Sequence, residues 1–177
     1  MPESSKTDEE IARQVQAGDS ESFGPLVARY EAKLIRYARK FLFDASDVED
    51  LVQEVFLKAY VNIRSFEPSR RFSPWIYRIA HNEFVNALKK KKREKISFFD
   101  LDTFFPHLAA KETADADLEK RDMRELLETG LKQLDAKYRE PLILYYIEGM
   151  DYQAIADILE IPRSTVGVRL ARGKAIL

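Results

Sequence analysis

The chain has 177 residues, of which 45% are hydrophobic and 33% are charged, which excludes an unfolded polar chain and allows one medium domain or two small ones. Cysteine is absent and histidine occurs twice, so disulfide frameworks, cysteine nucleophiles and cysteine-rich zinc sites are excluded. No signal peptide and no run of about 18 apolar residues is present, so we expect a cytoplasmic protein without stable membrane insertion.

The formal net charge of −1 argues at first against a nucleic-acid partner, but the charge is unevenly distributed. Residues 1–63 carry −4 and residues 96–160 carry −8, whereas residues 64–95 carry +7 and residues 161–177 carry +4. Local charge matters more than total charge for binding a polyanion. The two basic blocks, each at a predicted helix, are therefore candidate DNA-binding segments.

The first helical signals lie near the N-terminus. Thr7 and Glu10 form a capping box, which predicts a helix that stops at Gly18. A longer helix is expected from about Ser20 to Leu42, because its apolar residues recur at helical spacing. These residues are Phe23, Leu26, Val27, Tyr30, Leu34, Tyr37, Ala38 and Phe41.

A third helix is predicted from Ser46 to Ile63, with Ser46 and Glu49 as a second capping box. Its apolar seam consists of Val48, Leu51, Val52, Val55, Phe56, Ala59 and Ile63. The opposite face carries Asp47, Asp50, Glu54 and Lys58. This face is either a solvated surface with a weak Glu54–Lys58 pair or an acidic surface for a protein partner.

Residues 64–75 mix aromatic and basic side chains, a composition that suits unstacked single-stranded bases. Core packing of Phe66, Phe72 and Trp75 is the alternative interpretation, and we expect at least one of them in the core. Ser73 as N-cap and Pro74 at the first helical position then predict the start of a fourth helix.

This fourth helix carries a polar stripe opposite its apolar residues and ends in a run of basic residues. The stripe comprises Arg78, Asn82, Asn86, Lys89 and Arg93. Asparagine reads base edges, and arginine and lysine hold phosphates, so the stripe is equipped for both kinds of contact. A solvated, cationic helix end that interacts with the helix dipole is the alternative for the basic run of residues 89–93.

Residues 95–117 have a proline, short acidic residues and no sustained helical period, which predicts a linker between two all-helical domains, residues 1–94 and 118–177. The aromatic residues of this segment favour packing against a domain or a partner. In the second domain, Tyr152, Ile155, Ala156 and Leu159 line one helix, residues 160–162 form a short break, and a basic helix starts at Arg163. This is the helix-turn-helix pattern.

The last helix is expected to bury Val166, Leu170 and Leu177 and to present Thr165, Arg169 and Arg172 on another face. An enzyme is not indicated, because His81 and His107 lie in different segments and no nucleophile is paired with a base. We therefore expect no catalytic residue, no metal and no cofactor.

Three stretches together, Ser46 to Ile63, Ser65 to Arg93 and Leu134 to Leu177, resemble the group IV, extracytoplasmic-function (ECF) sigma factors of bacterial RNA polymerase. The resemblance covers nearly the whole chain except the linker. It implies a sigma-2 domain in residues 1–94, which binds core polymerase and recognises and melts the minus-ten element. It also implies a sigma-4 domain in residues 118–177, which recognises the minus-thirty-five element.

The resemblance implies a role for each polar surface. In sigma-2, the core-polymerase contacts on the β′ clamp helices would be Asp47, Asp50, Gln53 and Glu54. The minus-ten contacts would be Arg64, Phe66, Arg71, Trp75, Arg78, Asn82, Asn86, Lys89 and Lys90, with a flipped non-template base held by the loop. In sigma-4, the minus-thirty-five contacts would be Arg163, Ser164, Thr165, Arg169, Arg172 and Lys174. The outer face of sigma-4 would seat the β flap of the polymerase.

Two residues depart from the family pattern. Glu160 stands where glycine is usual in the helix-turn-helix turn, so the turn either avoids positive φ or is strained. Gly167 replaces a side chain of the recognition helix and lowers helix stability by roughly 1 kcal/mol.

The helical pattern predicts an all-α protein, and the resemblance implies an ECF sigma factor without chemistry of its own, regulated by an anti-sigma factor. The first alternative is a stand-alone helix-turn-helix regulator, which needs dimerisation and palindromic sites. The second is an adaptor whose basic helix binds an anionic membrane surface, an interpretation that the asparagine-bearing stripe disfavours.

Overall fold

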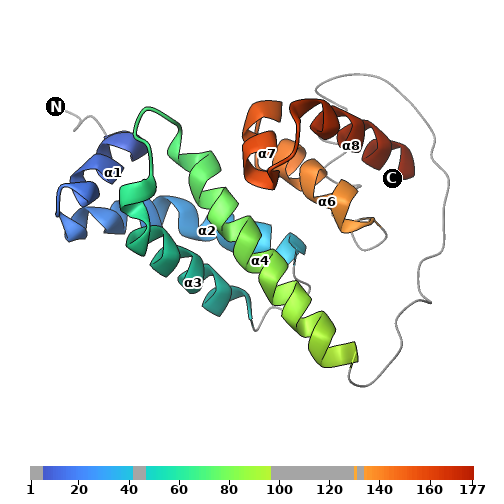
Figure 1. Cartoon of the computed structure of the whole chain (residues 1–177), viewed down its shortest axis with the longest axis horizontal. Helices are drawn as coiled ribbons and strands as arrows, with labels where there is room; N and C mark the ends of the chain where they lie inside the picture. Colours follow the sequence, from blue (N-terminus) through green and yellow to red (C-terminus); the bar gives the residue numbers. More distant parts are fainter. Residues whose placement is uncertain (1–5, 42–46, 97–129, 131–133) are drawn as a thin grey trace. The chain divides into compact units, whose positions relative to one another are not determined.

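The computed structural model describes residues 6–41, 47–96, 130 and 134–177. In these ranges every regular element is a helix, which confirms the predicted all-α fold (Figure 1). The chain divides into two compact units, Met1–Leu88 and Lys89–Leu177. Of the predicted linker, residues 95 and 96 belong to a helix, and residues 97–117 lie outside the described residues.

The described residues of the N-terminal unit form four α-helices and two short 3₁₀ turns, and Figure 1 shows their arrangement. In chain order these are α1 (Asp8–Gln16), η1 (Ser20–Ser22), α2 (Phe23–Phe41), α3 (Val48–Val61), η2 (Ile63–Ser65) and α4 (Phe72–Ile96). The helix α4 extends past the boundary of this unit. Helix α2 packs against both α1 and α3.

Helix α1 starts at the predicted capping box. The Thr7 hydroxyl accepts the Glu10 N–H at 3.2 Å, and the Glu10 carboxylate accepts the Thr7 N–H at 2.8 Å. The helix is attached to α2 through Asp8, whose carboxylate accepts bonds from the Tyr30 hydroxyl and the Arg29 guanidinium, both at 2.6 Å. Burial, followed by the bond to Asp8, raises the pKa of Tyr30 well above its usual value, so the hydroxyl stays a donor to Asp8.

Helix α3 shows the predicted apolar seam. Its buried side chains are Val48, Val52, Val55, Phe56 and Ala59, and Ile63 of η2 continues the seam. Leu51 is only half-buried. The predicted capping residue Ser46 lies outside the described residues, and the observed N-cap, Asp47, makes no side-chain capping bond.

Helix α4 begins at Phe72, one residue before the predicted N-cap Ser73. The Phe72 N–H donates to the Glu9 carboxylate of α1 at 2.9 Å, so a neighbouring helix supplies the cap. Pro74 falls within the first turn, where a missing N–H costs no intrahelical bond. The α2–α4 contact is aromatic, with the Tyr37 ring 5.3 Å from Tyr77 between centroids and the Tyr30 ring 5.5 Å from Phe72.

The C-terminal unit contains α6 (Ala136–Leu142), the π-helical turn η4 (Ile143–Ile147), α7 (Tyr152–Leu159) and α8 (Arg163–Ile176). Helix α8 packs on α6 and α7 (Figure 1). Its approach to α6 is close, since a Cβ on Gly173 would lie 2.7 Å from the Leu142 Cδ1 atom.

Helices α7 and α8 form the predicted helix-turn-helix, with α8 starting at Arg163. Glu160, in the turn, has φ 52° and ψ 45°, so the turn does adopt the left-handed conformation that glycine prefers. The predicted face of α7 is partly correct: Ile155 and Ala156 are buried, but the other two buried residues are Ala154 and Ile158, whereas Tyr152 and Leu159 are half-buried.

The seam of α8 also differs from the prediction at one position. Val166 and Leu170 are buried as expected. Leu177 is only half-buried, and the third buried position of α8 is Gly173. The apolar pattern of the sequence did not indicate Gly173, because a glycine has no apolar side chain. Its role is to let α6 approach α8 closely.

Candidate nucleic-acid interface

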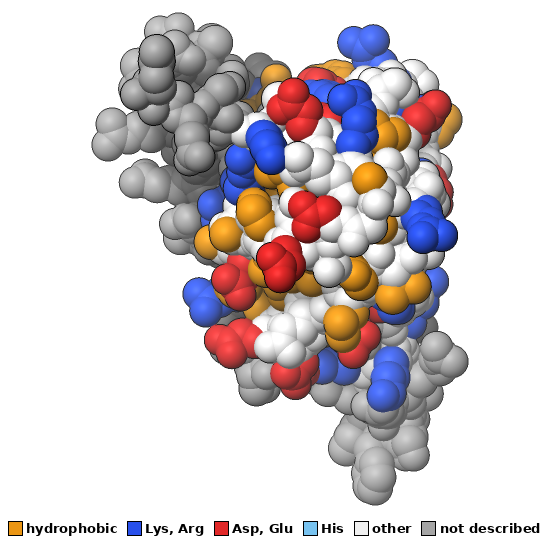
Figure 2. All heavy atoms as spheres, turned by 90° about the vertical axis from the view of Figure 1, so that its left-hand side faces the viewer, with side chains coloured by type: hydrophobic (Ala, Val, Ile, Leu, Met, Phe, Trp, Pro, Cys, Tyr) orange, Lys and Arg blue, Asp and Glu red, His pale blue; other side chains and the backbone are white. Residues whose placement is uncertain are grey.

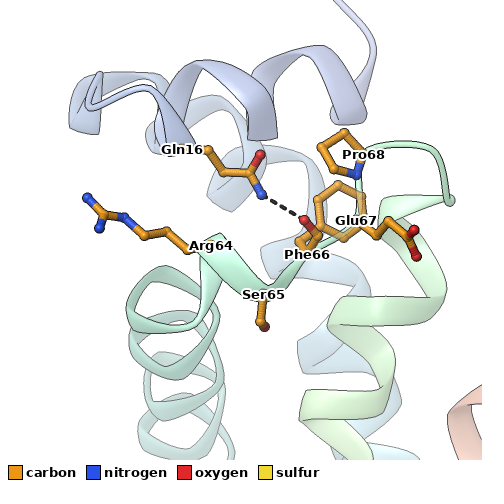
Figure 3. Close-up of a pocket in the computed structure, with 6 residues that line it drawn as sticks. All are labelled: Gln16, Arg64, Ser65, Phe66, Glu67 and Pro68. Atoms are coloured by element: carbon orange, nitrogen blue, oxygen red, sulfur yellow. Dashed lines mark hydrogen bonds between the residues drawn. The ribbon is translucent and has the colours of Figure 1, made fainter.

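The loop of residues 66–71, between η2 and α4, borders an open hollow on the N-terminal unit (Figure 3). The hollow has a volume of about 610 Å³ and is lined by Gln16, Arg64, Ser65, Phe66, Glu67 and Pro68. In Figure 3 the Gln16 amide points toward the Phe66 carbonyl, whereas the Arg64 side chain extends away from it. Arg64, Ser65 and Glu67 are exposed, so the hollow offers charges of both signs and a hydroxyl to a ligand.

Phe66, a predicted DNA contact, belongs to the core. Its side chain is 3% exposed, and its ring centroid lies 5.3 Å from those of Phe72 and Trp75. A ring enclosed in this way has no free face for stacking on a base. The prediction that Phe66 contacts DNA is therefore corrected to an anchoring role, and Trp75, which is half-buried, is the aromatic residue of this cluster that reaches the surface.

The polar stripe of α4 is exposed along the described part of the helix. Ile76, Ala80 and Phe84 are fully buried. The exposed stripe residues are Arg78, Asn82, Asn86 and Lys89, and the neighbouring Lys90 and Arg71 of the preceding loop are exposed as well. The side chain of Arg93 lies outside the described residues. One α-helix thus places amides and cations on its accessible face directly after the loop.

The acidic face of α3 is accessible at Asp50, Gln53 and Glu54, whereas Asp47 is half-buried. The predicted weak pair with Glu54 is corrected, because the Lys58 ammonium lies 2.6 Å from the carboxylate of Glu83 on α4. Glu54 is therefore not tied to Lys58 and belongs to the open acidic face.

The same face of α3 continues into apolar residues that sequence reasoning missed. Leu57, Tyr60 and Val61 are 59%, 41% and 77% exposed. They follow Gln53 and Glu54 at helical spacing, so polar and apolar groups form one stripe on α3. The sequence could have indicated them, because these three apolar residues lie outside the predicted buried seam of the helix.

Helix α8 brings together the predicted contacts of the second unit. Arg163, Ser164 and Arg172 are exposed, and Thr165, Arg169 and Lys174 are half-buried. Position 167 offers only a glycine between them, where an added Cβ would lie 3.6 Å from the Tyr152 ring. The helix therefore has cations and hydroxyls from which a groove-binding surface can be made.

Gln16 on α1 is a further residue that the sequence gave no reason to single out. Its Nε2 atom donates to the carbonyl oxygens of Ile63 and Phe66 at 2.8 and 2.7 Å. A local sequence pattern cannot predict a contact between residues that are about 50 positions apart in the chain. Only the position of Gln16 seven residues after Glu9 and three after Arg13, on one helix face, is visible in the sequence.

The surface of the N-terminal unit seen from its α1 side shows acidic, basic and apolar side chains interspersed (Figure 2). Among the described residues, no group of three histidine, aspartate or glutamate side chains is arranged to hold a metal ion. Within the same ranges, no helix is long and apolar enough to cross a membrane.

Comparison with protein families gives two matches. The family Sigma-70 region 2 matches residues 26–94, and Sigma-70, region 4 matches residues 124–177. Together they include most of α2, all of α3, most of α4 and all described helices of the C-terminal unit.

Among similar proteins, the ECF RNA polymerase sigma factor SigW of Bacillus subtilis is 32% identical, over 93% of this chain and 91% of its own length. The ECF RNA polymerase sigma-E factor of Escherichia coli K12 is 30% identical, over 95% and 91%. Among solved structures, CnrH in complex with the cytosolic domain of CnrY has a TM-score of 0.67 and 29% identity, covering 96% of this chain and 94% of that one.

The sigma factor RpoE in complex with the anti-sigma factor NepR, from Bartonella quintana, has a TM-score of 0.64 and 27% identity. It covers 87% of this chain and 92% of that one. Both regions of the family are thus matched in the expected order, and the sequence relationship extends over nearly the full chain. The chain belongs to the sigma-70 family of bacterial RNA polymerase factors, in its extracytoplasmic-function (ECF) group.

Proposed function

We propose that this chain binds core RNA polymerase, directs it to specific promoters and starts DNA melting. The observation that carries the assignment of DNA contacts is the exposed stripe of α4, which presents Asn82 and Arg78 while the opposite face of the helix is buried. Residues 1–94 act as sigma-2 and residues 118–177 as sigma-4 in this proposal, with residues 95–117 as the linker.

The two partners use different surfaces. Core polymerase docks its β′ clamp helices on the α3 face with Asp47, Asp50, Gln53 and Glu54, and Leu57 and Val61 add apolar area next to these residues. The β flap binds the C-terminal unit. Asparagine amides suit base edges, and the lysines and arginines of α4 and α8 suit phosphates.

Regulation by an anti-sigma factor is part of the proposal. The solved structure of Bartonella quintana RpoE contains the anti-sigma factor NepR. The solved structure of CnrH contains the cytosolic domain of CnrY. We expect an inhibitor of this chain to cover the α3 face or the DNA-facing helices. The site of action is the bacterial cytoplasm, where core polymerase is present.

Run-off transcription with sigma-free core polymerase and a promoter library tests the function. We expect specific initiation from a subset of promoters only when the chain is added. Asn82→Ala should change the preferred base at one minus-ten position. Tight specific DNA binding without polymerase, and no transcription, would establish a stand-alone regulator instead.

Binding of the chain to anionic vesicles, without any effect on transcription, would support the membrane adaptor. A loss with Asn82→Ala that is equal on every promoter would assign Asn82 to backbone contact or to folding rather than to base recognition.

A further inference from the structure

One face of α1 holds the backbone of the loop that follows η2. Gln16 lies at the C-terminal end of α1, and both of its bonds go to main-chain carbonyls, that of Ile63 in η2 and that of Phe66, the first residue of the loop. At 2.8 and 2.7 Å these bonds are of ordinary length for an amide donor. One side chain therefore fixes two carbonyls that lie outside any α-helix.

Two more residues of the same face reach the rest of the loop. The Arg13 Nη2 atom donates to the carbonyl of Pro68 at 3.4 Å, and the Glu9 carboxylate accepts the N–H of Phe72 at 2.9 Å. Together with Gln16 these residues follow the loop from its first residue to the start of α4. Side chains spaced by four and three residues share a helix face, so one side of α1 serves the whole loop.

The loop has few main-chain hydrogen bonds of its own, so its conformation depends strongly on the hydrogen bonds from α1. For residues 66–71 the structure shows the Phe66 N–H bonded to the Ile63 carbonyl at 3.1 Å and the Arg70 N–H bonded to the Glu67 carbonyl at 2.9 Å. Main-chain groups need partners, and a loop without a ladder or a helix obtains them from side chains. Gln16 is half-buried, so its two bonds are partly shielded from competing water.

We propose that Gln16 is a positioning residue for promoter melting: it sets the shape of the 66–71 loop so that the adjoining hollow can hold an unpaired base. This inference rests on the proposed function, because it assigns to Gln16 a part in the same DNA contact. Gln16 lines the hollow itself, next to Arg64 and Ser65 (Figure 3). The attachment of α1 to α2 through Asp8 makes α1 a fixed support for this task.

The test uses full-length chain bound to core polymerase and a single-stranded oligonucleotide with the minus-ten element selected by the wild type. An abasic scan of this oligonucleotide identifies the position whose base contributes most to affinity. Gln16→Met keeps the length and helix propensity of the side chain but removes both donors. The loss of two hydrogen bonds predicts an affinity about tenfold lower for the intact oligonucleotide.

The abasic oligonucleotide separates positioning from a general structural effect. When the scanned base is missing, wild type and Gln16→Met should bind equally well, because no base remains to be held. An equal loss on both oligonucleotides, or no loss on either, overturns the inference. Gln16→Lys keeps donors for the same carbonyls and should restore most of the affinity, which provides a second variant if Gln16→Met folds poorly.

Gln14→Met is the matched control on the same helix. The side-chain Oε1 atom of Gln14 accepts bonds from the Ser22 hydroxyl and the Lys6 ammonium, at 3.3 and 3.2 Å, and this side chain is half-buried like that of Gln16. This variant should bind both oligonucleotides as the wild type does, and a tenfold loss here contradicts a role specific to Gln16. If the wild type itself fails to initiate transcription, the proposed function fails; if the wild type initiates and the Gln16 variants bind as it does, the inference alone fails.

Discussion

Glu160 is the non-glycine residue with positive φ in the described part of the chain, and it sits in the turn of the helix-turn-helix. Its own N–H and that of Ile161 both donate to the Ala156 carbonyl, which closes α7 in the manner of a glycine-capped helix end. A side chain with a Cβ in this conformation costs roughly 1–2 kcal/mol. The turn therefore keeps the geometry that the motif requires although the residue is unfavourable.

Glu160→Gly is expected to stabilise the C-terminal unit by about 0.5–1 kcal/mol, because relief of strain exceeds the added freedom of the unfolded chain. Hydrogen exchange of amides in α7 and α8 measures this change in the intact chain. Glu160→Ala retains the Cβ and removes the charge, so it should give no comparable gain. If Glu160→Gly and Glu160→Ala protected the amides of α7 and α8 from exchange equally, the stabilisation would come from loss of the charge and not from the backbone conformation.

The helices show where local signals suffice. The capping box at Thr7 and the apolar seam of α3 were predicted correctly, because both depend on residues three or four apart. The start of α4 was not, since its cap comes from Glu9, 63 residues away in sequence. Phe66 was misassigned for the same reason: composition identified an aromatic loop but not which ring the neighbouring helices enclose.

The two glycines of α8 provide a matched pair for the packing of this helix. Gly167→Ala meets only an ordinary contact with Tyr152, so it should stabilise the unit by about 0.5–1 kcal/mol through helix propensity. Gly173→Ala brings its Cβ to 2.7 Å from the fully buried Leu142, and overpacking typically costs about 1–3 kcal/mol. We therefore expect a net loss of stability for this variant.

Hydrogen exchange in α6 and α8 should rise for Gly173→Ala and fall for Gly167→Ala. Fluorescence of Trp75, the single tryptophan of the chain, reports the N-terminal unit and serves as an internal control that neither change should affect. Stabilisation of the unit by Gly173→Ala would show that α6 and α8 tolerate a wider separation than the structure indicates.

Over the whole molecule, near-neutral net charge results from basic and acidic segments that cancel. The exposed cations of α4 and α8 face DNA in the proposed function, and the acidic stripe of α3 faces polymerase. Acidic segments next to the DNA-facing helices weaken binding of the free chain to polyanions. Such a distribution favours DNA binding by the complex over DNA binding by the chain alone.

Replacing Lys89 and Lys90 with glutamine should lower promoter affinity of the polymerase complex on all sequences. The slope of log affinity against log salt should decrease by about 0.7–0.9 for each phosphate that the lysines no longer neutralise. Lys33→Gln with Arg39→Gln removes two exposed charges from α2 and is the charge-matched control. An unchanged slope in the Lys89 and Lys90 variant would make these lysines a solvated part of α4 that does not touch DNA.

The support of the 66–71 loop by α1 has a consequence for how promoter preference evolves. Every bond described above from Glu9, Arg13 and Gln16 to this region ends on a main-chain atom and none on a loop side chain. Substitutions at exposed loop positions can therefore change which DNA is read while the fold of the loop is retained. The chain separates the residues that maintain a binding surface from those that give it specificity, so related factors can diverge in target without rebuilding the scaffold.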